Sequence, residues 1–173
     1  MKTLIITDVQ NDFLPGGALA VKKGDQIIPV INKIQDRFDL VVATQDWHPE
    51  NHGSFASSHQ GKDVFDKTEL GGLEQILWPD HCVQNTKGAE FHPDLETNNV
   101  EAIIRKAMEP EIDTYSVFYD NGHKKDTGLA GYLRGREADD LYFCGLASDF
   151  CVNYSVRDAI KEGFSATLVE DAS

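Results

Sequence analysis

The stretch that decides the fold is DDLYFCGLASDFCVNYSVRDAIKEGFSATLVEDA, residues 139–172. Its first part, 139–147, is a largely apolar run typical of a buried strand. Residues 149–164 have the pattern of a helix that Gly163 ends, and residues 165–172 form a second strand pattern. A strand, a helix and a strand in this order are typical of a right-handed crossover between parallel strands, so the stretch predicts an α/β fold.

The rest of the chain extends this pattern. Three more buried-strand patterns are TLIITDV (3–9), DLVVATQD (39–46) and NVEAIIRKA (99–107). Residues 26–38 place apolar side chains at helical spacing, with Pro29 tolerated in the first turn. Strands that alternate with helices predict a three-layer αβα, Rossmann-like fold, with a mainly parallel sheet and helices on both faces.

The 173 residues predict one domain, 1–173, with an insertion at about 47–98. This insertion is rich in Pro, Gly, Asn and His, and we expect one short helix in it, around Leu70–Leu77. A long irregular segment in a compact domain usually carries function. An α/β fold normally places another helix after the fifth strand, so a C-terminal helix is missing if the native chain continues past Ser173.

Composition and charge argue against nucleic acid and membranes as partners. The chain is 40% hydrophobic and 26% charged, which is ordinary for a globular protein, and its net charge of −13 disfavours binding to nucleic acid and anionic membranes. No apolar run approaches the roughly 20 residues that span a bilayer. The start MKTLIITDV reaches Asp8 too soon for a secretory signal, and an odd number of cysteines indicates reduced thiols. We therefore expect a cytoplasmic protein; a homo-oligomer stays open.

Polar residues stand where the predicted strands end. The first strand ends at Asp8, the second at Asp46 and the third at Lys106, while Cys151 begins the helix after the fourth. Each residue alone has an ordinary role, such as a turn cap, a solvated lysine or a buried thiol. Ligands of parallel α/β sheets bind at the carboxyl ends of the strands, so the shared position favours a functional site.

Three of these residues form a coherent reacting group. A thiolate is the reactive form of cysteine, and a helix N-terminus together with the Lys106 ammonium would lower the pKa of Cys151. The Asp8 carboxylate can take the thiol proton and later return it to a leaving group. Backbone amides around 147–151 can bind an oxyanion. The trio predicts nucleophilic hydrolysis.

A second group of residues has the character of metal ligands. The stretch TQDWHPENHGSF (44–55) contains Asp46, His48 and His52, and His81 follows about thirty residues later. One carboxylate and three imidazoles suit zinc, iron(II) or manganese. Spacing alone leaves two readings open, a metal site and a polar surface loop. The remaining histidines are interpreted as surface residues: His59, His92 and His123.

Five motifs in order carry a family resemblance: DVQNDFLPGGAL (8–19), TQDWHPENHGSF (44–55), WPDHCV (78–83), the lysine of RKA (105–107) and GLASDFCV (145–152). Together they closely resemble the nicotinamidase/pyrazinamidase group of the isochorismatase-like cysteine hydrolases. Relatives with isochorismatase activity lack the nucleophilic cysteine, so its presence favours the amidase branch. Phe150 departs from the family, since some members have histidine there.

The resemblance implies an isochorismatase-like fold and hydrolysis of nicotinamide, and also of pyrazinamide, in NAD salvage. It implies the catalytic residues Asp8, Lys106 and Cys151. It implies one divalent metal, zinc before iron or manganese, on Asp46, His48, His52 and His81. It implies an oxyanion hole from the amides of Ala147 and Cys151, with a cis peptide between Leu146 and Ala147. It implies substrate contacts from Phe13, Trp78, Tyr115, Leu146 and Ala147.

Three alternatives remain open. A related amidase of the same family could act on a carbamoyl or ureido compound, although the aromatic pair Phe13 and Trp78 argues against it. A metal-bound water could attack directly, leaving Cys151 with a structural role. A non-catalytic metal- or ligand-binding module would leave the convergence of an acid, a lysine and a thiol without a purpose.

Overall fold

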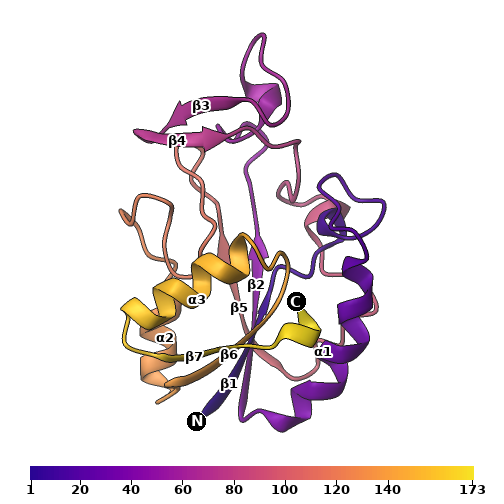
Figure 1. The fold of residues 1–173 in the computed structure, drawn as a ribbon, viewed down its shortest axis with the longest axis vertical. Coiled ribbons are helices and arrows are strands. Elements are labelled where there is room, and N and C mark those ends of the chain that lie inside the picture. The colour runs from indigo at the N-terminus through magenta and orange to yellow at the C-terminus, as the bar shows by residue number, and fades with distance from the viewer.

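A five-stranded parallel sheet forms the centre of the protein (Figure 1). The computed structural model describes residues 1–173. The strand order is β5-β2-β1-β6-β7, and every neighbouring pair is parallel. The strands are β1 (Lys2–Thr7), β2 (Leu40–Asp46), β5 (Val100–Lys106), β6 (Asp140–Gly145) and β7 (Ser165–Leu168). The five predicted strands are thus confirmed, with bounds that differ by a few residues.

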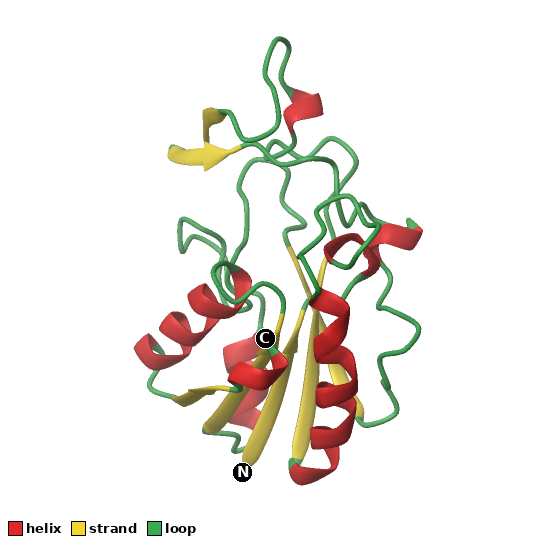
Figure 2. Ribbon diagram, turned by 45° about the vertical axis from the view of Figure 1, so that its right-hand side comes forward, coloured by secondary structure: helices red, strands yellow, loops and turns green.

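Helices cover both faces of this sheet, as the alternating pattern predicted (Figures 1 and 2). Helix α1 (Ile28–Ile34), lengthened by a 3-10 turn at each end, lies on one face. Helices α2 (Leu129–Gly135) and α3 (Cys151–Lys161) lie on the other. The three-layer αβα architecture is confirmed.

The side chains of β1 alternate between the two faces of the sheet, which explains why both faces are covered by helices. Leu4 and Ile6 belong to the core cluster that includes Ile31 of α1. Ile5, between them, belongs to the opposite cluster with Leu133 of α2. Successive side chains of a strand point to opposite faces, so an apolar run such as LII must be buried on both sides.

One prediction for the insertion was wrong. Residues around Leu70–Leu77 form an antiparallel hairpin of β3 (Lys67–Leu70) and β4 (Leu73–Ile76), with Leu70 opposite Leu73. Gly71 and Gly72 join the strands with φ angles of 62° and 83°. Two consecutive left-handed residues suit a tight hairpin turn and end a helix, so the two glycines decide against a helix.

The segment between β2 and β5 lies above the carboxyl ends of the strands. Figure 1 shows the β3–β4 hairpin at the end of the molecule opposite the N-terminus, beyond the loops that follow β1, β2 and β5. Apart from the hairpin, this segment contains two 3-10 turns, Ala56–Ser58 and Lys87–Ala89, and otherwise irregular chain with isolated β-bridges. The insertion therefore covers the sheet edge where the polar strand ends meet.

No helix has the length and apolar character that crossing a membrane requires.

Candidate active site

The carboxyl edge of the sheet brings Asp8, Lys106 and Cys151 together. Lys106 Nζ lies 3.0 Å from Asp8 Oδ2 and 3.5 Å from Cys151 Sγ. Carboxylate oxygens of Asp8 and Asp46 lie within 4.8 Å of that sulfur and of each other. All these side chains are buried, and the Lys106 side chain is 0% exposed.

Strand register places the lysine beside its acids. Lys106 ends β5 opposite Asp46, which ends β2. Its ammonium donates hydrogen bonds to the Asp46 carboxylate and to the Thr114 carbonyl. Asp8 follows β1 with a φ of 49°, and Thr44 donates a hydrogen bond of 2.7 Å to its Oδ1. A fully buried ammonium is thus compensated by two carboxylates, as burial of a charge requires.

Burial controls the protonation of this trio. It raises the pKa of the Cys151 thiol well above its ordinary value, because loss of solvent outweighs the favourable charge of Lys106. Burial likewise raises the pKa of Asp8 against the pull of Lys106. For Lys106, burial opposes the charged form, but Asp46 and Asp8 outweigh it and raise the pKa. The expected lowering of the Cys151 pKa was therefore wrong: its helix begins in a buried site.

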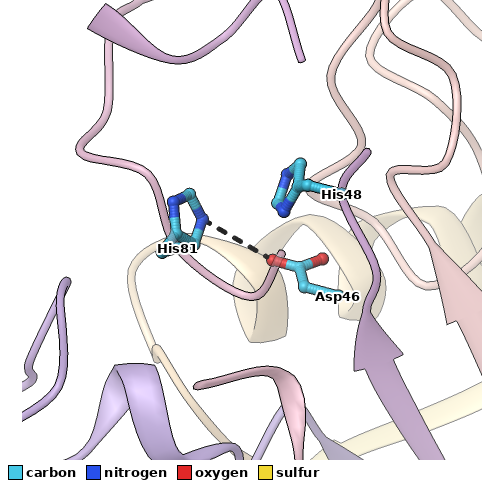
Figure 3. A group of neighbouring side chains, drawn as sticks. All are labelled: Asp46, His48 and His81. Atoms are coloured by element: carbon cyan, nitrogen blue, oxygen red, sulfur yellow. Dashed lines mark ion pairs between the residues drawn. The ribbon is translucent and has the colours of Figure 1, made fainter. Parts of the chain in front are cut away.

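Three of the four predicted metal ligands form one group. Donor atoms of Asp46, His48 and His81 lie within 4.8 Å of one another, and Figure 3 shows the three side chains pointing toward a common space. His81 Nε2 lies 4.0 Å from Asp46 Oδ2. The ligands come from the end of β2 and from the loop after β4, so β2 and the insertion together form the candidate metal site.

The hydrogen bonds of these imidazoles fit a metal. His81 Nδ1 lies 2.8 Å from the Pro79 carbonyl, which can only accept, so Nδ1 carries the hydrogen and Nε2 offers its lone pair. Burial lowers the pKa of His81 to about 4, which keeps the ring neutral at pH 7. His48 is 1% exposed, yet neither ring nitrogen has a hydrogen-bond partner. Such orphaned buried nitrogens are rare, and a metal ion would satisfy one.

His52 lies beside this group but not in it. Its ring centroid is 4.7 Å from that of His48. The backbone N–H of Ser54 donates to His52 Nδ1 at 3.1 Å, so in the neutral ring Nε2 carries the hydrogen and has no lone pair for a metal. The geometry does not favour His52 as a fourth ligand, and that role stays a prediction.

Asp113 is a site residue that the sequence did not predict. Its carboxylate is 3% exposed and lies 3.6 Å from His48 Nε2, in a second group with His52. Burial disfavours this carboxylate, but His48 and His52 outweigh burial and lower the pKa of Asp113. The residue stands in the irregular segment after Lys106, where no periodicity marks it. A buried carboxylate on a ligand histidine is a common means of orienting the ring.

A cavity of about 210 Å³ opens onto both groups. Its lining includes Cys151, His81 and Asp113, together with four aromatic side chains: Phe13, Trp78, Tyr115 and Phe150. Trp78 packs edge-on against Phe150, with ring centroids 5.3 Å apart. The volume is below the roughly 300–1,000 Å³ typical of drug-sized ligands, so it suits a single aromatic ring.

The loop before α3 contains the predicted oxyanion hole. The amides of Ala147 and Cys151 donate no hydrogen bond within the protein, and no side chain caps the helix. The expected cis peptide between Leu146 and Ala147 is confirmed. Ala147 lines the cavity. Leu146 is buried in the core cluster near Gly24, and its predicted substrate contact stays a prediction.

Fold and site together define an α/β enzyme with a cysteine, a lysine and an acid at the carboxyl edge of a parallel sheet. A family model, described as the isochorismatase domain, matches residues 2–173. The chain therefore belongs to the isochorismatase family. It is similar to the nicotinamidases of Acinetobacter baylyi (51% identity, covering 98% of this chain and 79% of the relative) and Escherichia coli (45%, 98% and 81%).

The comparison with solved structures also finds nicotinamidases and pyrazinamidases to be similar to this chain. An Acinetobacter baumanii nicotinamidase and pyrazinamidase has a TM-score of 0.97 at 50% identity, over 99% of this chain and 83% of that chain. A protein from L. infantum in complex with nicotinate has a TM-score of 0.87 at 42% identity, over 100% and 80%. The pyrazinamidase of Pyrococcus horikoshii, in complex with zinc, has a TM-score of 0.78 at 43% identity, over 99% and 84%.

Proposed function

We infer that this protein is a nicotinamidase, which hydrolyses nicotinamide to nicotinate and ammonia and also accepts pyrazinamide. The observation that carries this inference is the convergence of Cys151, Lys106 and Asp8 beside a small cavity with aromatic walls. Similarity to nicotinamidases at 51% and 45% identity supports the same substrate. The reaction would serve NAD salvage.

The cavity walls would hold the pyridine ring. Phe13 and Trp78 offer aromatic faces and edges, and aromatic rings gain about 0.5–1.5 kcal/mol from such contacts beyond the burial itself. The carboxamide would then lie beside Cys151, with its oxygen toward the amides of Ala147 and Cys151. This orientation places the bond to be cleaved next to the thiol.

The trio would catalyse the reaction in two stages, formation of a thioester on Cys151 and then its hydrolysis. Asp8 takes the proton of Cys151, and the sulfur attacks the carboxamide carbon while Lys106 stabilises the charged pair. The two free amides bind the oxyanion. Asp8 returns the proton to the amide nitrogen, the C–N bond breaks, and ammonia leaves a thioester on Cys151. Asp8 then takes a proton from water, whose oxygen attacks the thioester. The C–S bond breaks, Asp8 returns the proton to the sulfur, and nicotinic acid leaves and ionises to nicotinate in solvent.

Asp46, His48 and His81 would hold one divalent metal, with zinc as the first choice. The zinc complex of a pyrazinamidase of the same fold supports this choice, although iron and manganese share these ligands. When bound, the ion supplies a Lewis acid for the ring nitrogen of the substrate and for water. Asp113 would orient His48 through its contact with the ring.

We further propose that residues 1–173 form one domain, because both core clusters pack on the same sheet. Three free cysteines support a reducing, cytoplasmic location. Association into a homo-oligomer stays a prediction.

Ammonia release from a panel of amides tests the proposed activity. Nicotinamide and pyrazinamide should be hydrolysed, while ureido and carbamoyl compounds, which lack an aromatic ring, should be poor substrates. A preference for the ureido or carbamoyl compounds would favour the related amidase instead. Binding of nicotinamide without ammonia release would favour a non-catalytic module.

A further inference from the structure

The β3–β4 hairpin contributes one buried side chain to the protein, and that side chain is polar. Gln75 is 3% exposed, whereas every other residue of the two strands is half-buried or exposed. A solvent-facing hairpin does not need a buried amide for its own stability, and burial of an amide costs free energy unless it is hydrogen-bonded. The contacts of Gln75 therefore indicate what the hairpin does.

The Gln75 amide joins two residues of the cavity wall. Its Nε2 donates to Asp113 Oδ2 at 3.0 Å and lies 3.0 Å from the Tyr115 hydroxyl. It also reaches the Ile76 carbonyl at 2.7 Å. A carboxylate and a carbonyl can only accept, so the orientation of the amide is fixed by chemistry. The amide has two N–H groups for these three acceptors, so one N–H is shared between two of them. Asp113 and the Ile76 carbonyl hold the amide in place, and the amide contacts the Tyr115 hydroxyl.

Tyr115 transmits this contact to the aromatic walls. The Trp78 indole N–H donates to the same hydroxyl at 3.3 Å. The Tyr115 ring packs on Phe150, with centroids 5.5 Å apart. Tyr115 therefore contacts two walls of the cavity, Trp78 through its hydroxyl and Phe150 through its ring, and Gln75 contacts the same hydroxyl.

The hairpin also packs against the segment that leads to Asp113 and against the loop after His52. A Cβ on Gly71 would meet the Glu111 carbonyl at 3.0 Å, and a Cβ on Gly53 would meet a Leu70 methyl at 2.5 Å. The hairpin thus packs directly against the chain that leads to Asp113. Movement of the hairpin would shift Gln75 and the wall together.

We propose that Gln75 is a positioning residue for substrate binding, which acts through the Tyr115 hydroxyl to fix the Trp78 and Phe150 walls around the pyridine ring. This inference rests on the proposed nicotinamidase activity. Gln75 contacts none of Asp8, Lys106 or Cys151, so its loss should weaken binding of the substrate and leave the chemical steps nearly intact.

The test replaces Gln75 with methionine, which keeps the length of the side chain but has no N–H. KM for nicotinamide should rise about three- to ten-fold, because the hydrogen bond that positions the Tyr115 hydroxyl is lost, while kcat stays within about two-fold. Glu74→Gln, an exposed change on the same strand, is the matched control and should leave both constants unchanged. Gln75→Asn, whose amide is too short to reach, should repeat the effect and serves if Gln75→Met does not fold.

A double-variant cycle separates positioning from general structural support. In a Tyr115→Phe background the hydroxyl is absent, so Gln75→Met should cause little further rise in KM. Lower thermal stability with unchanged KM would overturn the proposal, and so would a full KM effect without the hydroxyl. Failure of the wild-type protein to release ammonia from nicotinamide would instead refute the activity itself.

Discussion

At the scale of single residues, burial keeps the Cys151 thiol protonated at rest. Cys151 is 7% exposed, and the Lys106 ammonium beside it does not compensate for lost solvent, so the pKa of the thiol is raised. Asp8, which is fully buried, also has a raised pKa and can hold the thiol proton between steps. Attack therefore requires proton transfer within the trio, which gives the carboxylate its role.

This protonation state gives the first prediction. In protein freed of metal, Cys151 should carry its proton at neutral pH and lose it only above the ordinary thiol pKa of 9.0, because the folded-state pKa is raised. The ultraviolet absorbance of thiolate, taken as wild type minus Cys151→Ser, should be absent near pH 7. Cys82 and Cys144 are also buried with raised pKa values, so they add no signal. A strong thiolate difference at neutral pH would contradict the prediction.

Residues at strand ends could be predicted from sequence, whereas residues in irregular segments could not. Asp46 and Lys106 end buried strands, and parallel strands deliver their ends to one edge. Asp113 and Gln75 depend on tertiary contacts among the segment after β5, the hairpin and the histidines, which no local pattern encodes.

At the scale of elements, the pairing of β6 with β1 fixes the loop that precedes Cys151. Gly145 ends β6 opposite Thr7 with a φ of 103°. A Cβ at this position would lie 2.0 Å from the Thr7 carbonyl oxygen. Only glycine fits both the conformation and the space, so the chain can turn at once toward Ala147.

Gly145→Ala should lower the free energy of unfolding by about 2–5 kcal/mol, because left-handed strain adds to a backbone clash. Urea denaturation measures the change. Gly131→Ala is the matched control: no atom lies within 4 Å of its Cβ position in α2, so alanine should stabilise by about 0.5–1 kcal/mol. Equal stabilities for the two variants would refute the assigned role of Gly145.

Elements with long apolar patterns were predicted correctly, and short elements near glycines were not. The hairpin was mistaken for a helix, since the Gly71–Gly72 turn outweighed the spacing of leucines around it. Helix α2 was not predicted, because two of its seven residues are glycine and only Leu129 and Leu133 mark its buried side at helical spacing. Its stability comes from packing in the second core cluster.

At the scale of the whole molecule, the sheet edge supplies the reacting trio and the insertion completes the metal site. His81 comes from the insertion, while Asp46 belongs to both groups, since it contacts Lys106 and faces His81. The αβα fold followed from the alternation of strands and helices. The path of the insertion could not be predicted, because it contains little regular structure.

Substitution of one proposed metal ligand should remove the metal without unfolding the protein. His81→Ala should lower the zinc content well below one per chain and abolish tight nicotinate binding, while circular dichroism shows a retained fold. His92→Ala, a partly exposed histidine at the surface, should keep both the metal and the binding. Full zinc occupancy in His81→Ala would exclude His81 from the ligand set.

Ammonia release from nicotinamide, measured side by side for the wild type and Cys151→Ala, tests the account most directly. The wild type should release ammonia. Cys151→Ala should release none above background, with its fold and metal content unchanged, because the thioester cannot form. Substantial turnover by the variant would contradict the covalent mechanism and favour attack by metal-bound water.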